Sequence, residues 1–401
     1  MKGKVLIGVL TSAMLIAFSS LVFADEQLEI GALYPISGGL ALLGEESWRG
    51  AEIARIQRNK QGGIGGKEIV FVKGDASTVS AARSEAERLV EQKKVKAILG
   101  TYSSSRCMAA SEVTARKKIP YFELGAIANN ITERGYKTIW RTNPTAADFS
   151  RAQVDFLVNW FAPKVGKKTA DMRIGIAHED SDYGTSVADA FVGLAKDAGM
   201  QVVSVEPYAA NSSDLSSVIF RLRQAKPDIV VAVSYANDAI LLSRQALELK
   251  LKCPILGTGG GHSLQSFVDA LGDKANGVFD VDFTQYRVNR NYAPGIDAFL
   301  ELYRKTFKEN PRSGHSLCNY MGANVVFDII EAAGGLDDMI KIAEAAKSKK
   351  IDPGNTPTGW GVNFDDTGQN VAAMPLVTEW INGELVTVWP KNAAVEEPII
   401  Y

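Results

Sequence analysis

Short apolar runs and amphipathic segments alternate along this chain from Leu28 onward, and this alternation limits the possible folds more than any other feature. The apolar runs are predicted to be β-strands, at residues 28–33, 68–72, 95–99, 120–122, 172–177, 201–205, 228–233 and 254–256. Apolar residues recur with helical spacing between them, and helices are predicted at 45–59, 79–92, 107–117, from 147, from 185, at 214–224 and at 238–250. Strands joined by helical crossovers form parallel sheets that are covered on both faces. The sequence therefore predicts an α/β fold.

The alternation restarts after Pro144, which predicts two doubly wound lobes. A chain of 401 residues is too long for one typical core and has room for two. The last part of the chain differs, with helices predicted at 293–308, 317–333 and 336–348, and strand patterns over 361–389 that include an Asn382-Gly383 hairpin signal. We expect this part to return and complete the two lobes.

The expected N-terminal lobe comprises residues 25–144 and about 282–352, and the expected C-terminal lobe comprises 145–281 and about 353–401. No Pro- or Ser-rich linker separates them, so several short crossings are expected to join the lobes. Clefts between such lobes are where small ligands bind. The cleft is therefore the predicted ligand site.

The first residues have the pattern of an export signal. Lys2 and Lys4 precede a nearly uncharged apolar run, and Ala24 is a small residue just before Asp25. This is typical of a secretory signal peptide, here at residues 1–24 and cut after Ala24. The alternative is an N-terminal membrane anchor. No cysteine follows the run, and no later segment approaches the ~20 apolar residues of a spanning helix, so the mature protein is expected in the periplasm.

Charge and cysteine content exclude some classes of partner. The formal net charge is −2, so no basic surface is predicted and nucleic acid is not an expected partner. The three cysteines, Cys107, Cys253 and Cys318, lack the spacing of a metal site, and neither a metal nor another cofactor is expected. We interpret all three as buried, small apolar residues, with a disulfide of Cys107 as the alternative.

Signals of enzymatic chemistry are weak. The glycine run at 62–66 follows a helix and precedes a strand, the reverse of a dinucleotide fingerprint, and is interpreted as a helix C-cap and turn. The glycine run at 257–261 follows a strand, so it either cradles a phosphate or lets a ligand approach the backbone. No serine lies in a Gly-x-Ser-x-Gly elbow. The histidines are scattered, with His262 and His315 expected at the edge of the cleft.

Serines cluster where the predicted strand at 95–99 meets the predicted helix at 107–117. Ser103, Ser104 and Ser105 bring hydroxyl groups and helix N-terminal amides to one point. Such a point suits a carboxylate, because the helix N-terminus favours negative charge and offers unpaired N–H donors. The alternative is an ordinary serine N-cap.

Several motifs resemble those of the type I periplasmic substrate-binding proteins of ABC importers, in the branched-chain amino-acid (leucine-binding protein) family. The resemblance covers essentially the whole mature chain and rests on GALYPISGG at 31–39, Gly44, RGA at 49–51, NKQGGIGGK at 59–67, Asp75, RTNP at 141–144, DYG at 182–184 and GVNFDDTG at 361–368. It implies two Rossmann-like lobes joined by three crossings around a closing cleft. It also implies capture of a ligand without a reaction, so that the chain is not an enzyme.

The resemblance further implies a set of ligand-binding residues. Ser104 stands where the family's serine binds the ligand carboxylate through its hydroxyl and amide. Gly125 and Ala126 stand where backbone groups meet the ligand, and Tyr183 and Tyr235 where aromatic side chains of the second lobe face it. The other residues implied to lie at the site are Tyr102, Ser103 and Leu43.

Two departures from the family's pattern concern the ligand's ammonium group. Leucine binders have a threonine where this chain has Ile127, and a glutamate where it has Gly259. A buried ammonium without an anionic partner costs several kcal/mol, so these changes argue against an ordinary α-amino acid. Glu123, Asp280 or Asp282 can supply a displaced carboxylate, and the wider pocket and its tyrosines suit an aromatic acid.

The resemblance implies that the protein is the periplasmic component of an ABC importer of the branched-chain amino-acid type. It is expected to capture an amino acid or an organic or aromatic acid, and to deliver it as a monomer to a permease driven by ATPase subunits. The alternatives are a ligand sensor of the same fold and a hydrolase acting through Ser104 or the loop at 257–261.

Overall fold

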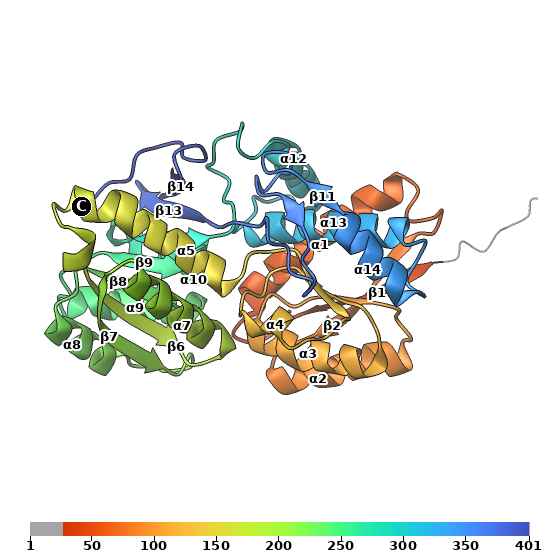
Figure 1. Cartoon of the computed structure of the whole chain (residues 1–401), viewed down its shortest axis with the longest axis horizontal. Helices are drawn as coiled ribbons and strands as arrows, with labels where there is room; N and C mark the ends of the chain where they lie inside the picture. The colour runs from red at the N-terminus through yellow and green to blue at the C-terminus, as the bar shows by residue number, and fades with distance from the viewer. Residues whose placement is uncertain (1–26, 401) are drawn as a thin grey trace, which may run out of the picture.

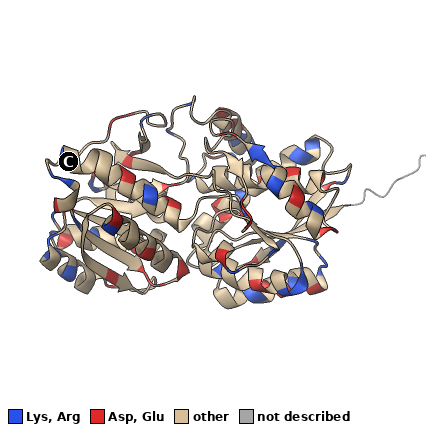
Figure 2. Cartoon of the chain, in the orientation of Figure 1, with Lys and Arg blue, Asp and Glu red and all other residues tan. Residues whose placement is uncertain are grey.

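The computed structural model describes residues 27–400, which form two α/β lobes side by side (Figure 1). The predicted signal peptide and its cleavage site lie outside the described residues. Between residues 27 and 400, none of the helices combines the length and apolar character needed to cross a membrane. Lysine, arginine and acidic residues are mixed over both lobes, in keeping with the small net charge (Figure 2).

The first lobe is built on a five-stranded parallel sheet in the order β2-β1-β3-β4-β5. Its strands are β1 Leu28–Tyr34, β2 Ile69–Asp75, β3 Ile98–Gly100, β4 Tyr121–Glu123 and β5 Ile139–Arg141. Helices α2 (Val79–Glu87) and α3 (Ser104–Lys117) pack together on one face, and α1 (Ala41–Lys60) packs with α13 (His315–Ala332) on the other (Figure 1). The helices of this lobe are α1 Ala41–Lys60, α2 Val79–Glu87, α3 Ser104–Lys117, α4 Asn130–Glu133, α12 Ile296–Phe307, α13 His315–Ala332 and α14 Met339–Ser348. The strand order reverses between β1 and β3, where doubly wound sheets bind ligands.

The second lobe is built on a seven-stranded sheet in the order β14-β13-β10-β9-β8-β6-β7. Its strands are β6 Arg173–Glu179, β7 Gln201–Tyr208, β8 Ile229–Val233, β9 Ile255–Thr258, β10 Phe279–Asp282, β13 Leu376–Ile381 and β14 Glu384–Trp389. The first five are parallel, and β13 and β14 add an antiparallel edge. The helices are α5 Ala146–Phe156, α6 Ala162–Lys164, α7 Asp182–Asp197, α8 Ser216–Ala225, α9 Ala236–Glu248, α10 Gly260–Ser263 and α11 Gln265–Leu271.

Four short helical turns also belong to the described elements. They are η1 Arg88–Gln92, η2 Leu157–Phe161, η3 Thr169–Asp171 and η4 Gly272–Ala275. The predicted hairpin is confirmed, because Asn382 and Gly383 join β13 to β14 with φ angles of 51° and 77°, as a tight primed turn requires. The predicted turn at 62–66 is also confirmed: the backbones of Ile64 and Lys67 exchange two hydrogen bonds of 3.0 Å there.

The chain passes between the two sheets three times: between β5 and α5, between β10 and α12, and before β13. The two short strands β11 Lys350–Ile351 and β12 Val362–Asn363 pair with each other, and Gln369 forms a bridge with Arg141 at the end of β5. Because the segment after β12 continues the first sheet, we infer that the last crossing follows Gln369. This is later in the chain than the expected boundary at 352 and 353.

Two strands that position the site were not predicted from the pattern, β5 and β10. Strand β5 has only three residues, and β10 has the sequence Phe-Asp-Val-Asp, whose acids are typical of an exposed segment. Both aspartates are nevertheless completely buried. The interpretation of the cysteines needs one correction: all three are unpaired, but Cys253 is only partly buried because it lies in the loop before β9, whereas Cys107 and Cys318 are buried.

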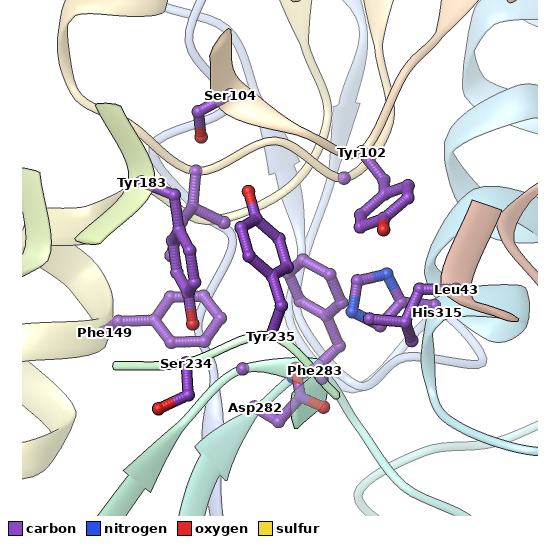
Figure 3. A pocket seen from close by; sticks show the side chains of 14 residues that line it. Leu43, Tyr102, Ser104, Phe149, Tyr183, Ser234, Tyr235, Asp282, Phe283 and His315 are labelled. Atoms are coloured by element: carbon purple, nitrogen blue, oxygen red, sulfur yellow. The ribbon is translucent and has the colours of Figure 1, made fainter. Parts of the chain in front are cut away.

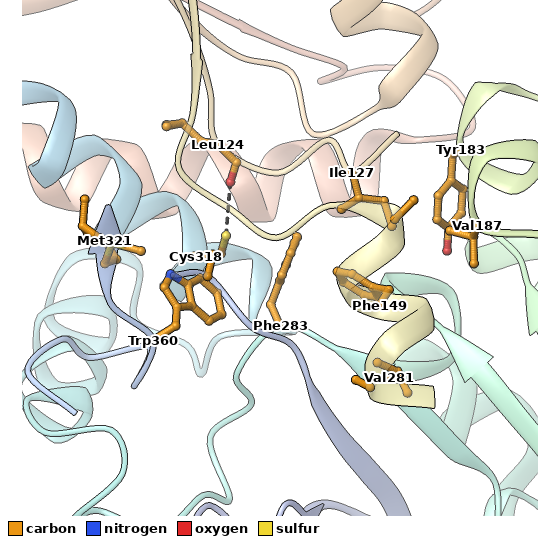
Figure 4. Packing of buried hydrophobic residues seen from close by; sticks show 14 of the residues in the cluster. Leu124, Ile127, Phe149, Tyr183, Val187, Val281, Phe283, Cys318, Met321 and Trp360 are labelled. Atoms are coloured by element: carbon orange, nitrogen blue, oxygen red, sulfur yellow. Dashed lines mark hydrogen bonds between the residues drawn. The ribbon is translucent and has the colours of Figure 1, made fainter. Parts of the chain in front are cut away.

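A continuous apolar core connects the two lobes at their junction (Figure 4). Leu124 and Ile127 of the first lobe belong to the same buried cluster as Phe149 and Val281 of the second. The Cys318 thiol donates to the carbonyl of Leu124 over 3.2 Å and ties α13 to the loop after β4. The lobes are thus closed on each other in this structure.

Candidate functional site

Ser104 is the first residue of α3, directly after the turn that follows β3. Its hydroxyl oxygen accepts a hydrogen bond of 3.2 Å from the amide of Ala128, in the loop after β4. The first amides of a helix have no partner within the helix and carry partial positive charge. Ser104 therefore brings a hydroxyl and an electropositive helix terminus to the same place.

A cavity lies between the lobes, with Ser104 at one end (Figure 3). Small-molecule sites occur preferentially at such junctions between domains. The residues that border it come from both lobes: Leu43, Tyr102, Ser104, Gly125, Ile127 and His315 from the first, and Phe149, Tyr183, Ser234, Tyr235, Gly259, Gly260, Asp282 and Phe283 from the second. No lysine or arginine is among them. The structure thus has a cavity in the cleft, where the ligand site is predicted.

Aromatic side chains form most of the cavity wall. The rings of Tyr183 and Tyr235 lie 5.1 Å apart, centroid to centroid, and stand between Ser104 and the far end of the cavity (Figure 3). On the other side, the ring of His315 contacts Tyr102 at 5.5 Å and Phe283 at 4.9 Å. Such walls suit a flat or apolar ligand body.

The hydroxyl groups of two wall tyrosines are held by backbone carbonyls. Tyr102 donates to Leu40 over 2.9 Å, and Tyr183 donates to Thr258. Burial raises the pKa of both phenols well above the ordinary value, so they remain protonated. The orientation of each ring is therefore defined before a ligand enters.

Asp282 provides the carboxylate at the end of the cavity opposite Ser104 (Figure 3). Its Oδ2 accepts hydrogen bonds from Ser263 Oγ at 2.6 Å and Gln285 Nε2 at 3.0 Å, and its Oδ1 accepts from the Phe283 amide at 2.7 Å. Burial raises the pKa of Asp282 to about 7, against the opposing effect of these donors. The group is thus balanced between its neutral and charged forms near neutral pH.

His315 is a neutral polar group on the cavity wall. Its Nδ1 lies 3.4 Å from Ser47 Oγ, and burial lowers its pKa to about 3. An unprotonated imidazole can accept or donate a hydrogen bond without adding charge. The expectation that His315 lies at the cleft is met, whereas His262 is buried behind β9 and does not border the cavity.

Three of the expected ligand-binding residues lie outside the cavity lining: Glu123, Ser103 and Ala126. Glu123 is fully buried at the end of β4, and its carboxylate accepts hydrogen bonds from the backbone amides of Thr101, Tyr102, Leu124, Gly125 and Ala126. It is therefore turned toward the two loops that carry the site and away from any ligand ammonium. The Ser103 hydroxyl accepts from Arg106, and the Ala126 carbonyl accepts from Arg141 and Asn143.

Sequence reasoning missed three lining residues, Phe149, Ser234 and Phe283. Ser234 follows the buried strand β8, and Phe283 follows β10, so both stand at the carboxyl ends of parallel strands, where ligands of such sheets bind. That rule identifies Ser234 from the sequence, whereas Phe283 requires β10 to be recognised first. Phe149 lies within α5, where its apolar side chain has the spacing of an ordinary core residue.

The glycines at 259 and 260 border the cavity and leave space that side chains would fill. Gly259 has φ of 69°, and a Cβ atom there would lie 2.8 Å from Tyr183 Oη. A Cβ atom at Gly260 would lie 2.7 Å from a methyl carbon of Leu43 across the cavity. Among residues 27–400, no cluster of three or more potential metal ligands is present.

Comparison with known proteins agrees with this architecture. A family model described as periplasmic binding protein matches residues 27–384. The Leu/Ile/Val-binding protein homolog 8 of Brucella abortus (strain 2308) is 46% identical over 397 residues, which cover 98% of each chain.

Two solved structures share the fold at lower sequence identity. The branched-chain amino-acid transporter substrate-binding protein of Streptococcus pneumoniae, in complex with isoleucine, is 23% identical with a TM-score of 0.77, covering 93% of this chain and 100% of that one. A solute-binding protein of an ABC transporter from R. palustris, in complex with benzoate, is 21% identical with a TM-score of 0.78, covering 93% and 99%. This chain belongs to the periplasmic binding protein family, as a type I protein of its branched-chain amino-acid class.

Proposed function

We propose that this protein captures a small carboxylate in the periplasm and delivers it to the membrane permease of an ABC importer. The observation that carries the proposal is the placement of Ser104 and the α3 N-terminus at one end of a cavity closed between two lobes. A carboxylate bound there replaces its water contacts with a charge-assisted hydrogen bond and with backbone amides, in a site that excludes solvent.

The aromatic walls support a ligand with an apolar or aromatic body. Tyr102, Tyr183, Tyr235, Phe149 and Phe283 border the cavity, and rings of this kind pack on flat ligands. The structural relatives bind isoleucine in one case and benzoate in another, so this fold accommodates both kinds of body. The ligand class we propose is a monocarboxylate of this size.

Ser104 itself is set up for binding rather than for nucleophilic attack. Among the described residues, its hydroxyl has the Ala128 amide as its hydrogen-bond partner, and no imidazole or carboxylate is in position to take its proton. An activated serine needs such a base within hydrogen-bond reach. A hydrolase acting through Ser104 is therefore not favoured.

A thermal-shift screen of the mature protein from Asp25 onward tests the proposal. The panel contains branched-chain amino acids, aromatic acids, dicarboxylates and short amides. A ligand that binds the folded state raises the melting temperature by mass action. The proposal predicts a rise with at least one monocarboxylate and recovery of that compound unchanged. No rise with any carboxylate, or its conversion to a product, would contradict it.

A further inference from the structure

The cavity has a second polar end, and its position relative to Ser104 limits the ligands that can use both. Figure 3 shows Ser104 at one end and Asp282 at the other, with the rings of Tyr183 and Tyr235 between them. A ligand that reaches both ends therefore carries a polar group at each of its own ends, with its body between the two rings.

Asp282 and Gly259 both border the cavity, and Gly259 stands where the resemblance places the family's glutamate. Strands β9 and β10 pair with Gly257 beside Asp280 and Thr258 beside Val281, and the amide of Gly259 donates to the Val281 carbonyl over 2.8 Å. Asp282 is thus the next residue of the neighbouring strand. A glutamate at position 259 itself would meet the Tyr183 hydroxyl and a left-handed φ.

Asp282 has unused capacity to accept a hydrogen bond, and no positively charged side chain among residues 27–400 pairs with it. The side chain is fully buried, and Oδ1 accepts only one hydrogen bond, from the Phe283 amide, although a carboxylate oxygen can accept two. No lysine or arginine borders the cavity, and Asp282 takes part in no ion pair among the described residues. Burying a carboxylate without a cation beside it costs free energy. A ligand that supplies the partner group offsets this cost.

We propose that Asp282 forms a second subsite, which binds a hydrogen-bond donor or a cationic group at the end of the ligand remote from its carboxylate. This deepens the proposed function and rests on it. The corresponding ligands are elongated: a carboxylate, an apolar or aromatic body, and a terminal ammonium or hydroxyl group. Tyr183 and Tyr235 then contact the body, and the two ends of the cavity select the length.

The experiment measures affinities by calorimetry for pairs that differ only in the far end. The pairs are hexanoate and 6-aminohexanoate, and benzoate and 4-hydroxybenzoate, with 4-methylpentanoate and leucine as the pair in which the ammonium is near the carboxylate. We expect at least one terminal group to improve affinity about tenfold or more. The pair that shows the gain distinguishes a cationic from a hydroxyl end group.

Asp282→Asn should remove this gain, while Asp280→Asn serves as the matched control. Asp280 lies two residues earlier on β10 and is equally buried, but it does not border the cavity. The proposal is overturned if the terminal groups add nothing in the unaltered protein, or if Asp282→Asn leaves their gain unchanged. Carboxylates that bind without preference for an end group overturn this inference alone, whereas failure of every carboxylate to bind overturns the proposed function with it.

The pH dependence of the unaltered protein provides a second measurement if Asp282→Asn does not fold. Because the pKa of Asp282 is about 7, the preference for 6-aminohexanoate over hexanoate should rise from pH 6 to pH 8. The other titratable groups around it are Asp280 on its own strand, His262 on α10, Tyr183 on α7, and His315 and Cys318 on α13.

Burial keeps both of these histidines and the Tyr183 and Cys318 groups neutral over this range. Burial also raises the pKa of Asp280, so Asp280→Asn shows whether that group contributes. A preference for 6-aminohexanoate that stays flat or falls with pH contradicts the proposal.

Discussion

The backbone amide of Asn129 donates a hydrogen bond of 2.9 Å to Ser186 Oγ, and this bond joins the two lobes beside the cavity. Asn129 follows the loop that carries Ile127, and Ser186 lies in the first turns of α7, which also carries Tyr183. A second bond, from the amide of Asp182 to Ser105 Oγ at 3.4 Å, lies on the same side. The hydrogen bonds that hold the lobes together therefore come from the same elements that form the cavity walls.

Ser186→Ala should weaken ligand binding without destabilising either lobe. It removes a hydrogen bond between the lobes, and a typical net value of about 0.5–1.5 kcal/mol corresponds to a loss of roughly two- to tenfold in affinity. Calorimetry with the ligand found in the thermal screen measures it. The melting temperature of the ligand-free variant should stay close to that of the parent protein. Unchanged affinity would show that this bond has no part in closure.

Glu123→Gln should destabilise the first lobe strongly. The carboxylate accepts hydrogen bonds from five backbone amides of the two site-bearing loops, and a glutamine presents one oxygen and one donor group in the same place. Four of these bonds reach Oε1, so a glutamine oxygen in that place still leaves the Thr101 amide, which donates to Oε2, facing an NH₂ group, at a cost of about 1–3 kcal/mol. Denaturant unfolding measures the loss. A stability equal to that of the parent would contradict this positioning role of Glu123.

Gly259→Ala should lower stability and reduce the space in the cavity. Its φ of 69° is unfavourable for alanine, and the added carbon would lie 2.8 Å from the Tyr183 hydroxyl. The strain amounts to about 1–3 kcal/mol. Gly193→Ala in α7 is the matched control, because nothing lies within 4 Å of its Cβ position and alanine favours a helix. An equal change of stability in the two variants would contradict the explanation that strain at position 259 lowers stability.

The pH dependence of stability should reveal the cost of burying Asp282. Its pKa in the folded protein, about 7, is higher than in an unfolded chain, where it is ~3.9. The folded state therefore holds this proton more tightly, and the contribution of the group to stability decreases as pH rises from about 4 to about 7 and is constant above.

Asp282→Asn removes that decrease. The free energy of unfolding of the variant, relative to the parent, should improve by about 4 kcal/mol between pH 4 and pH 8. Thermal or denaturant unfolding of both ligand-free proteins at the two pH values measures it. A difference that does not change with pH, or that changes in the opposite direction, would show that Asp282 is not the group that titrates.

Much of the fold could be predicted because its elements have strong periodic signals. Strand β8 is a continuous apolar run, β1 and β6 are apolar over most of their length, and the Asn382-Gly383 turn has a specific backbone requirement that only a few residue types meet. Strand β10 could not be predicted in this way, since its two aspartates have the pattern of an exposed segment. Tertiary packing buries them, and sequence periodicity contains no information about it.

The candidate site could be predicted where a residue type and its position at a strand end agree. Ser104 is predicted in this way, whereas Tyr183 is implied only by the resemblance of its motif; both border the cavity. In the sequence, Glu123 is one of three acids that can pair with an ammonium, beside Asp280 and Asp282, and in the structure its carboxylate accepts hydrogen bonds from five backbone amides. A carboxylate at the end of an apolar strand can face a ligand or the backbone of its own loops. Only the three-dimensional positions of the loop amides show which of these the carboxylate of Glu123 faces.

The central claim is that Ser104 binds the ligand's carboxylate, and calorimetry on Ser104→Ala tests it most directly. The matched control is Ser243→Ala in α9, a buried serine whose hydroxyl has no hydrogen-bond partner and which lies outside the cavity. With the carboxylate that gives the largest thermal shift, Ser104→Ala should weaken binding by about 1.5–3 kcal/mol, or roughly 10- to 100-fold. Ser243→Ala should leave the affinity unchanged. An affinity of Ser104→Ala equal to that of the parent would contradict the claim.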